Sequence, residues 1–309
     1  MAVPVNAAEI ERARLTRSAA LASSALALTL LVLKAWAAWA TGSVSMLGSL
    51  ADTTLDLLAS LLTLFAVGLA AQPADEDHRF GHGKAEAIAA LMQTLLIIGS
   101  AIAIMWRAIL AFGATDLPRA PEVGIGVSVA GIVLTLLLVS WQKVVVRRTG
   151  SIAISTDSLH YQSDLLLNGT VIVAFVLDVY LGLHGADAVF GIIIALWIAW
   201  SAIKSARHAI DMLMDREWPP EKSARLAAIA LAVPGVEDVH DLRTRSSGVI
   251  DFIQFHIWLA PDMTVQAAHD IVDTVELRLQ DAFPGAEFFI HIDPRGHRDD
   301  IAQPAHIAA

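Results

Sequence analysis

Six long apolar runs occupy most of the chain, and they constrain its fold more than any other feature. They span residues 18–40, 44–71, 86–112, 122–146, 152–181 and 186–209. An α-helix needs about 20 apolar residues to cross roughly 30 Å of hydrocarbon, and each run is long enough. Hydrophobic residues make up 56% of the chain and its mean hydropathy is +0.60, more than a water-soluble chain normally carries. The sequence therefore predicts an all-α bundle of six transmembrane helices within residues 1–215.

The distribution of basic residues predicts how these helices cross the membrane. Basic residues lie before the first run, after the second, and at or beyond the ends of the fourth and sixth: Arg12, Arg14, Arg17, Arg79, Lys84, Lys143, Arg147, Arg148, Lys204, Arg207 and Arg216. The other connections, near 41–43, 116–122 and 181–186, hold only Arg119. Because cytoplasmic loops carry the excess of Lys and Arg, we expect a multi-pass protein of the inner membrane with both termini in the cytoplasm.

After Trp218 the composition changes to that of a soluble domain, with charged residues between apolar ones. Hydrophobic periodicity predicts helices over 221–232 and 264–282, and strands over 239–245, 250–259 and 287–293. The order α-β-β-α-β predicts a ferredoxin-like α+β domain over residues 216–295, expected in the cytoplasm. Residues 296–309 are polar or small, which predicts a disordered tail.

Two pairs of ligand-type residues interrupt the apolar runs. Asp52 and Asp56 lie in the second run, His160 and Asp164 in the fifth, and each pair is spaced i, i+4. Four residues advance about 400° around a helix, so both members of a pair project from one face. Charge inside a membrane segment is costly and usually functional. If the two faces meet, three carboxylates and one imidazole surround a single point, which predicts a site for a divalent cation.

The residue types narrow the choice of ligand. The chain has no cysteine, so any metal must bind to histidines and carboxylates. Four nitrogen and oxygen ligands suit tetrahedral Zn²⁺, with Cd²⁺ and Fe²⁺ next, whereas an all-carboxylate site would favour Mn²⁺ or Mg²⁺. The alternative, helix capping or hydrogen bonding between helices, would leave three carboxylates to repel one another. The formal net charge of −10 argues against nucleic acid as a partner.

A second cluster lies in the connection between the second and third runs. Its candidate ligands are Asp75, His78 and His82. Gly81 and Gly83 permit tight turns, so the loop can fold back and close the three side chains on one metal ion. A solvated polar loop without a metal is the alternative.

Other polar residues near the runs have two interpretations each. Asp157 and Asn168 lie one turn from members of the fifth-run pair, and they either support the ligands or pack as ordinary polar groups. Lys84 begins the third run, and Asp215, after the sixth, is its natural ion-pair partner.

A third cluster lies in the C-terminal domain: His240, His256, His269, His291 and Asp293. His291 and Asp293 alternate on one predicted strand and therefore share a face. A single histidine is more often a surface or packing residue. Five ligand-type residues on three strands and a helix indicate a binuclear metal site, with a carboxylate able to bridge.

These motifs together resemble those of a known family. They are Asp52-x-x-x-Asp56, His160-x-x-x-Asp164, the loop Phe80-Gly81-His82-Gly83-Lys84-Ala85-Glu86 and the segment His240-Asp241-Leu242-Arg243-Thr244-Arg245. Over residues 10–295 the chain resembles the cation diffusion facilitator family, and within it the bacterial zinc transporters of the YiiP type. The resemblance implies a homodimer whose C-terminal domains, folded like copper metallochaperones, associate in the cytoplasm.

The resemblance also implies a role for each cluster. Asp52, Asp56, His160 and Asp164 would form the transport site, Asp75, His78 and His82 a loop site, and His240, His256, His269, His291 and Asp293 a binuclear cytoplasmic site. Lys84 and Asp215 would form an interlocking salt bridge. Some members of the family favour iron or manganese, so an exporter selective for Mn²⁺ or Fe²⁺ is an alternative.

The expected function is proton-coupled efflux of divalent cations by a secondary active transporter in the lipid bilayer, not an enzyme. Metal binding needs a neutral imidazole and ionised carboxylates, so loading displaces protons. A metal hydrolase would need a motif such as His-Glu-x-x-His, which the sequence lacks. A metal-gated channel would want weak successive sites instead of one cage. A sensor that used the C-terminal domain alone would need no charged residues in the membrane.

Overall fold

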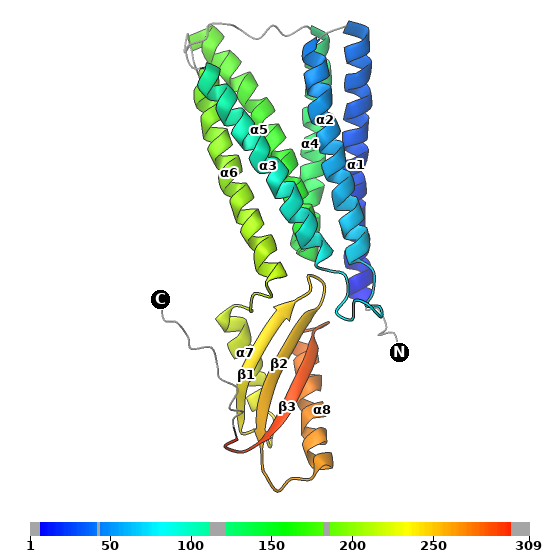
Figure 1. The fold of residues 1–309 in the computed structure, drawn as a ribbon, viewed down its shortest axis with the longest axis vertical. Helices are drawn as coiled ribbons and strands as arrows, with labels where there is room; N and C mark the ends of the chain where they lie inside the picture. Colours follow the sequence, from blue (N-terminus) through cyan, green and yellow to red (C-terminus); the bar gives the residue numbers. More distant parts are fainter. Residues whose placement is uncertain (1–6, 42–43, 112–121, 182–185, 298–309) are drawn as a thin grey trace. The chain divides into compact units, whose positions relative to one another are not determined.

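The computed structural model describes residues 7–41, 44–111, 122–181 and 186–297 (Figure 1). The chain divides into two compact units, Met1–Met214 and Asp215–Ala309. The three connections expected on the outer side of the membrane, and all of the predicted tail beyond residue 297, lie outside the described residues.

Six long helices form the first unit. They are α1 (Ala7–Thr41), α2 (Val44–Ala70), α3 (Ala85–Ala111), α4 (Glu122–Thr149), α5 (Ile152–Leu181) and α6 (Ala186–Leu213). Helix α1 packs against α2 and α4, and α3 packs against α6 and α5 (Figure 1). Many of the fully buried side chains are alanines, including Ala19, Ala20, Ala87 and Ala90. Small residues let helix backbones approach closely, as is typical of helix packing in membranes.

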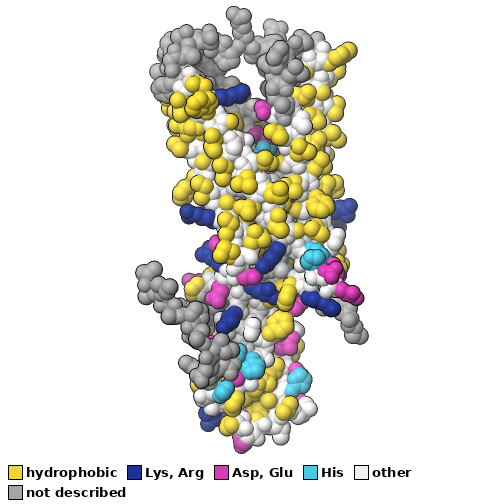
Figure 2. Space-filling model, viewed as in Figure 1, with side chains coloured by type: hydrophobic (Ala, Val, Ile, Leu, Met, Phe, Trp, Pro, Cys, Tyr) yellow, Lys and Arg dark blue, Asp and Glu magenta, His cyan; other side chains and the backbone are white. Residues whose placement is uncertain are grey.

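The first unit has the surface of a membrane domain. Hydrophobic side chains cover much of its visible face in Figure 2, and large ones such as Phe65, Leu95 and Trp200 are exposed. Four stretches are long and apolar enough to cross a membrane: Glu9–Trp36, Asp52–Ala70, Ala85–Leu110 and Ala188–Leu213. The prediction of a helical transmembrane region is confirmed. The count of six spans stays a prediction, because α4 and α5 do not meet this criterion within the described residues.

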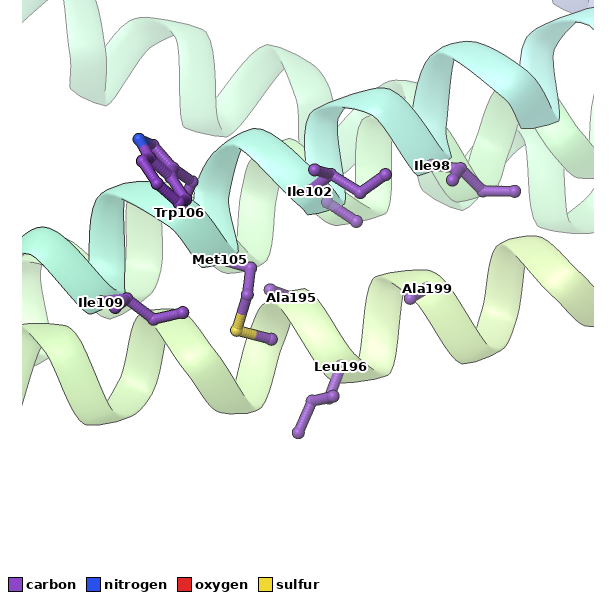
Figure 3. Close-up of a pocket in the computed structure, with 9 residues that line it drawn as sticks. Ile98, Ile102, Met105, Trp106, Ile109, Ala195, Leu196 and Ala199 are labelled. Atoms are coloured by element: carbon purple, nitrogen blue, oxygen red, sulfur yellow. The ribbon is translucent and has the colours of Figure 1, made fainter.

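An apolar groove of about 250 Å³ lies between α3 and α6. Figure 3 shows Met105 extending from α3 toward α6, with Ile102, Trp106 and Ile109 along the same stretch of α3. Every lining residue is apolar, so the groove offers no oxygen or nitrogen side-chain ligand for a cation.

The second unit contains five elements in the predicted order. They are α7 (Pro220–Leu231), β1 (Asp238–Ser246), β2 (Asp251–Leu259), α8 (Val265–Ala282) and β3 (Glu287–Pro294). The sheet order is β1-β2-β3, with β1 antiparallel and β3 parallel to the central β2. The prediction of a C-terminal α+β domain is confirmed. Thr264 begins α8 as its N-cap, since its side chain accepts a hydrogen bond from the amide of Ala267.

The core of the second unit forms between the sheet and the two helices. Ile253, Phe255 and Ile257 of β2 are fully buried and pack with residues of α7 and α8, such as Leu226 and Leu279. Side chains alternate between the two faces of a strand. The residue between Phe255 and Ile257 therefore projects from the other face of the sheet, and that residue is a predicted ligand, His256.

The buried phenyl ring at the centre of this core sets a stability prediction. Replacing Phe255 by Ala should lower the free energy of unfolding of the second unit by about 3–5 kcal/mol, because it removes a fully buried aromatic side chain. Hydrogen exchange of the strand amides in the full chain measures this change. Val265→Ala is the matched control, since Val265 is 87% exposed, and it should leave the exchange nearly unchanged. Equal protection in both variants would contradict the assigned core.

Candidate metal centres

The first candidate centre lies between α2 and α5 and combines members of both predicted pairs. His160 Nε2 lies 3.0 Å from Oδ1 of Asp56 and 3.7 Å from Oδ2 of Asp164. Ligand atoms of the three residues all lie within 4.8 Å of one another. The three side chains are 14%, 25% and 38% exposed in the order His160, Asp56, Asp164. One imidazole nitrogen and two carboxylate oxygens at these separations provide three of the four ligands of a tetrahedral cation.

Asp52 is the predicted member that the structure does not bring into this group. It lies one turn before Asp56 on α2 and is exposed. Among the described residues the close group contains only the other three. Its neighbour Thr53 accepts a hydrogen bond of 2.6 Å from Lys34 of α1. The role of Asp52 as a ligand stays a prediction.

The two polar neighbours singled out on α5 differ in their surroundings. Asp157 is fully buried, and it accepts hydrogen bonds from Gln93 of α3 and Gln142 of α4. Asn168 is exposed. Sequence reasoning missed both glutamines, because nothing in the spacing of single polar residues on separate helices shows that they converge on one carboxylate.

The second candidate centre lies in the connection between α2 and α3. Asp75 Oδ1 is 3.4 Å from His78 Nδ1, and Asp75 Oδ2 is 3.3 Å from His82 Nε2. The two imidazole rings have centroids 4.5 Å apart. Gly81 has φ +76°, so it supplies the left-handed conformation that lets the loop turn back between the two histidines. The structure thus brings the three predicted residues together within 4.8 Å.

The carboxylate of this loop is held in its charged form. The backbone amide of His78 donates a 2.6 Å hydrogen bond to Asp75 Oδ1, and this bond is the main reason that the pKa of Asp75 lies below its usual value. Burial acts in the opposite direction, and the charges of the two nearby histidines help to outweigh it. A carboxylate that is already ionised is ready to bind a cation.

Lys84 follows this loop at the start of α3. Its Nζ donates to the carbonyl oxygen of Leu213 at the end of α6, at 3.5 Å. Asp215 begins the second unit and has φ +56°. A pair between Lys84 and Asp215 would join the two units and stays a prediction.

The third candidate centre lies on the sheet of the second unit, on the face opposite the core. Asp293 of β3 is at its middle. Its Oδ2 lies 2.8 Å from His256 Nδ1 and 3.2 Å from His240 Nε2, and its Oδ1 lies 3.3 Å from His291 Nε2. One oxygen thus faces two histidines and the other oxygen faces the third. This is the arrangement that a carboxylate bridging two metal ions requires.

Asp293 is nearly inaccessible to solvent, with its side chain 3% exposed. Burial alone would raise its pKa. The hydrogen bonds and charges of His256, His291 and His240 outweigh that effect, so the pKa of Asp293 lies below its usual value. The carboxylate is therefore ionised at neutral pH.

His269 lies apart from the other four predicted members. It is on α8, its side chain is 65% exposed, and its Nδ1 lies 3.7 Å from Asp273 on the same helix. Among the described residues of this chain it joins no group of potential ligands. Within one chain, therefore, only four of the five predicted residues come together.

Asp241 is a potential ligand that sequence reasoning missed. It lies within 4.8 Å of ligand atoms of His240 and His256. On a regular strand it would point away from its neighbour His240. The β1–β2 pairing is irregular between His240 and Arg243, and Asp241 has φ +49°, so the alternation breaks at this point. The only sequence signal for Asp241 as a ligand was its position next to His240, and regular strand geometry would place the two side chains on opposite faces.

Comparisons with known proteins identify the family of both units. Residues 20–214 match the family model described as the cation efflux transmembrane domain, and residues 218–295 match that of the cation efflux protein, cytoplasmic domain. The chain is 46% identical over 281 residues to the cation-efflux pump FieF of Cronobacter sakazakii, covering 91% of this chain and 93% of that protein. It is 44% identical over 282 residues to FieF of Yersinia pestis, covering 91% and 94%.

Solved structures are similar to about a quarter of the chain. One is CzrB in its zinc form, with 37% identity, 27% of this chain and 97% of that chain covered, and a TM-score of 0.26. Another is the nickel form of the MamM CTD, with 27% identity, 25% and 99% covered, and a TM-score of 0.24. Family models cover both units, and the FieF relatives cover nearly the whole chain. The chain therefore belongs to the cation diffusion facilitator family of cation efflux transporters.

Proposed function

We propose that this cation efflux transporter exports Zn²⁺ from the cytoplasm in exchange for protons, with Cd²⁺ and Fe²⁺ as further substrates. The observation that carries the proposal is the group formed by Asp56, His160 and Asp164 between two helices of the membrane unit. Charged ligands inside an apolar bundle mark an ion pathway more often than a structural feature. Asp52, one turn away on α2, is the candidate fourth ligand.

The choice of zinc rests on the donor atoms. An imidazole nitrogen with carboxylate oxygens suits Zn²⁺, while harder cations such as Mn²⁺ prefer oxygen ligands alone. If Asp52 completes the group, three of its four ligands are carboxylates. A transporter selective for Mn²⁺ or Fe²⁺ is therefore the second candidate, and metal competition separates the two.

Proton exchange follows from the same ligands. A histidine binds a metal only as the neutral imidazole, and a carboxylate binds it only when ionised. Loading a cation on Asp56, His160 and Asp164 therefore releases any protons that they carry. Protons from the outer side then compete for the same atoms and promote release of the metal. The two states exchange by alternating access, in which a small slide of α2 against the antiparallel α5 opens or closes the group.

We also propose that the chain acts as a homodimer in the inner membrane, with both termini in the cytoplasm. The excess of Lys and Arg near the N-terminus and in the connections after α2 and α4 supports this orientation. Metal bound by the loop and by the sheet of the second unit would then report the cytoplasmic concentration. Such binding would bias which transport state is populated.

The isolated position of His269 supports a dimer in which ligands come from two chains. If His240, His256 and Asp293 Oδ2 bind one ion of the proposed pair, the described residues of one chain leave His291 and Asp293 Oδ1 as the ligands of the other. His269 is exposed on α8 and is not near them within one chain. A second copy of the chain that places its own His269 there would complete the site and would make metal binding tighten the dimer.

Transport through the membrane group predicts a clear effect of one imidazole. His160→Ala should lower zinc uptake into inside-out vesicles with an acidic lumen by at least about 10–100-fold, because it removes a ligand. Loss of a group that only orients a ligand already lowers metal affinity or activity by about that factor. His208→Ala is the matched control, because His208 is exposed on α6 and belongs to no ligand group among the described residues. Unchanged zinc flux in His160→Ala would contradict the proposal, as would stronger competition by Mn²⁺ than by Cd²⁺.

The dimer proposal predicts a selective effect on α8. His269→Ala should weaken the zinc-dependent dimer about tenfold while leaving the cluster around Asp293 intact, because one ligand from each partner is lost. Light scattering of the detergent-solubilised chain, with and without zinc, measures the dissociation constant. Gln280→Ala, a substitution at another exposed position of the same helix, should have no effect. The shared site would be excluded if zinc does not change the affinity of the dimer. It would also be excluded if zinc changes that affinity equally in the unmodified chain and in His269→Ala.

A further inference from the structure

A fully buried carboxylate lies one turn before His160 on α5, outside the group of potential metal ligands. Asp157 Oδ2 accepts a 2.7 Å hydrogen bond from Gln142 Nε2 of α4, and its Oδ1 accepts a 3.2 Å hydrogen bond from Gln93 Nε2 of α3. All three residues are 0–1% exposed. A carboxylate removed from water is costly unless hydrogen bonds compensate for its lost hydration. Here two amides on two different helices supply them.

The same contacts extend to α2. Gln93 Nε2 also lies 2.6 Å from Thr63 Oγ1 and 3.2 Å from the carbonyl oxygen of Ala59. Next to Asp157 along α5, Tyr161 contacts Ser60 Oγ of α2 at 2.9 Å and donates to the carbonyl oxygen of Ser23 of α1 at 3.1 Å. One buried polar layer thus connects α1, α2, α3, α4 and α5. It lies between the metal group and the ends of the helices joined by the α2–α3 and α4–α5 connections.

The orientation of the two glutamines makes the carboxylate the acceptor that they share. Both turn their amide nitrogens toward Asp157, and the Oε1 atoms of Gln93 and Gln142 have no hydrogen-bond partner among the described residues. An unpaired buried oxygen is unfavourable. The hydrogen bonds to Asp157 offset this cost, because a hydrogen bond to a charged acceptor is stronger than one to a neutral group.

Helix geometry links this layer to the metal group. Residues three apart on a helix differ by about 300° in rotation, so Asp157 and His160 project in directions about 60° apart. When Gln93 and Gln142 fix the direction of Asp157, they also fix the rotation of α5. That rotation decides whether His160 Nε2 meets Asp56 Oδ1 on α2, as it does at 3.0 Å. A turn of a few tens of degrees would carry the imidazole away from the α2 carboxylate.

We propose that Asp157 is a positioning residue of the metal group: through its two amide donors it holds α5 in the rotation that brings His160 and Asp164 to Asp56. The inference rests on the proposed function of that group. It assigns the carboxylate no contact with the cation. What matters at this position is the set of hydrogen bonds that tie α5 to α3 and α4, not the negative charge on residue 157 as such.

This distinction can be tested with two substitutions at one position. Asp157→Leu removes both acceptor oxygens, so zinc affinity should fall about 10–100-fold, as for the loss of a group that orients a ligand. Asp157→Asn removes the charge but keeps one acceptor oxygen for Gln93, and Gln142 can turn its unpaired Oε1 toward the introduced amide. This variant should therefore keep most of the affinity. Titration calorimetry of the purified full chain measures zinc binding, and vesicle transport separates KM from maximal rate.

Two results would overturn the proposal. Zinc affinity and KM unchanged in Asp157→Leu would show that the hydrogen bonds do not position the ligands. A loss in Asp157→Asn as large as in Asp157→Leu would show that a carboxylate is required at position 157 itself, as a ligand or a proton carrier. Should Asp157→Leu fail to fold, Gln142→Leu removes one donor and keeps the carboxylate. It should give a smaller loss of affinity, and an unchanged affinity there also overturns the proposal.

A direct variant of the metal group separates this inference from the proposed function. Asp56→Asn removes a potential ligand and leaves Asp157 and both glutamines in place. If Asp56→Asn abolishes zinc binding at the membrane site while both Asp157 variants behave as wild type, only the positioning role is wrong. If Asp56→Asn leaves zinc transport intact, the proposed function itself is wrong.

Discussion

Hydrocarbon provides no partner for a hydrogen bond, so every polar side chain inside the membrane unit must find one within the protein. This constraint explains why the polar residues of the six helices gather in layers. One layer holds Asp56, His160 and Asp164, and the next holds Asp157 with its two glutamines. Elsewhere the helices meet through alanines together with buried larger side chains such as Ile97, Ile154 and Ile198. The polar layers restrict the rotation of each helix further, because every buried donor and acceptor must meet a partner.

A third polar group lies at the end of the unit that carries the α2–α3 connection. Glu86 of α3 is buried and pairs with Arg12 of α1 at 3.1 Å, while Ser151 donates to it at 2.6 Å. Arg12 also donates to the carbonyl oxygen of Thr149 at the end of α4. Breaking a buried ion pair by removing one partner leaves an uncompensated charge, which costs about 3–5 kcal/mol. The contacts of Glu86 thus hold three segments together beside the loop centre, only a few residues after His82.

Much of this arrangement can be predicted from the sequence, and the reasons are local. The spacing Asp52-x-x-x-Asp56 and His160-x-x-x-Asp164 fixes which side chains share a helix face, and the resemblance to a known family suggested that the two faces meet. Alternation on β3 likewise placed His291 and Asp293 on one face. The partners of Asp157 could not be found in this way. Gln93 and Gln142 lie on separate helices, and only the packing of α3, α4 and α5 brings their amides to one carboxylate.

Two further differences have a physical cause that local pattern does not contain. Asp241 joins His240 because the strand is irregular there, with a left-handed residue that no alternation rule anticipates. His269 is a ligand-type residue, but α8 places it on an exposed surface away from the sheet cluster. Residue types therefore indicate candidate ligands but do not indicate which of them come together. A set depends on contacts between elements far apart in sequence.

The centres differ in how completely the chain surrounds them, and this difference bears on what each can do. Asp293 and His240 of the sheet are 3% and 8% exposed, and one carboxylate is shared among three histidines. Under the proposed function, a cation held there would leave slowly, because several buried contacts must break together, and slow release suits a regulatory site. The membrane group provides three close ligands from two helices. Under the proposed function this group must release its cation on every cycle. Ligands split between two helices serve that requirement, because a shift of one helix against the other changes the coordination at once.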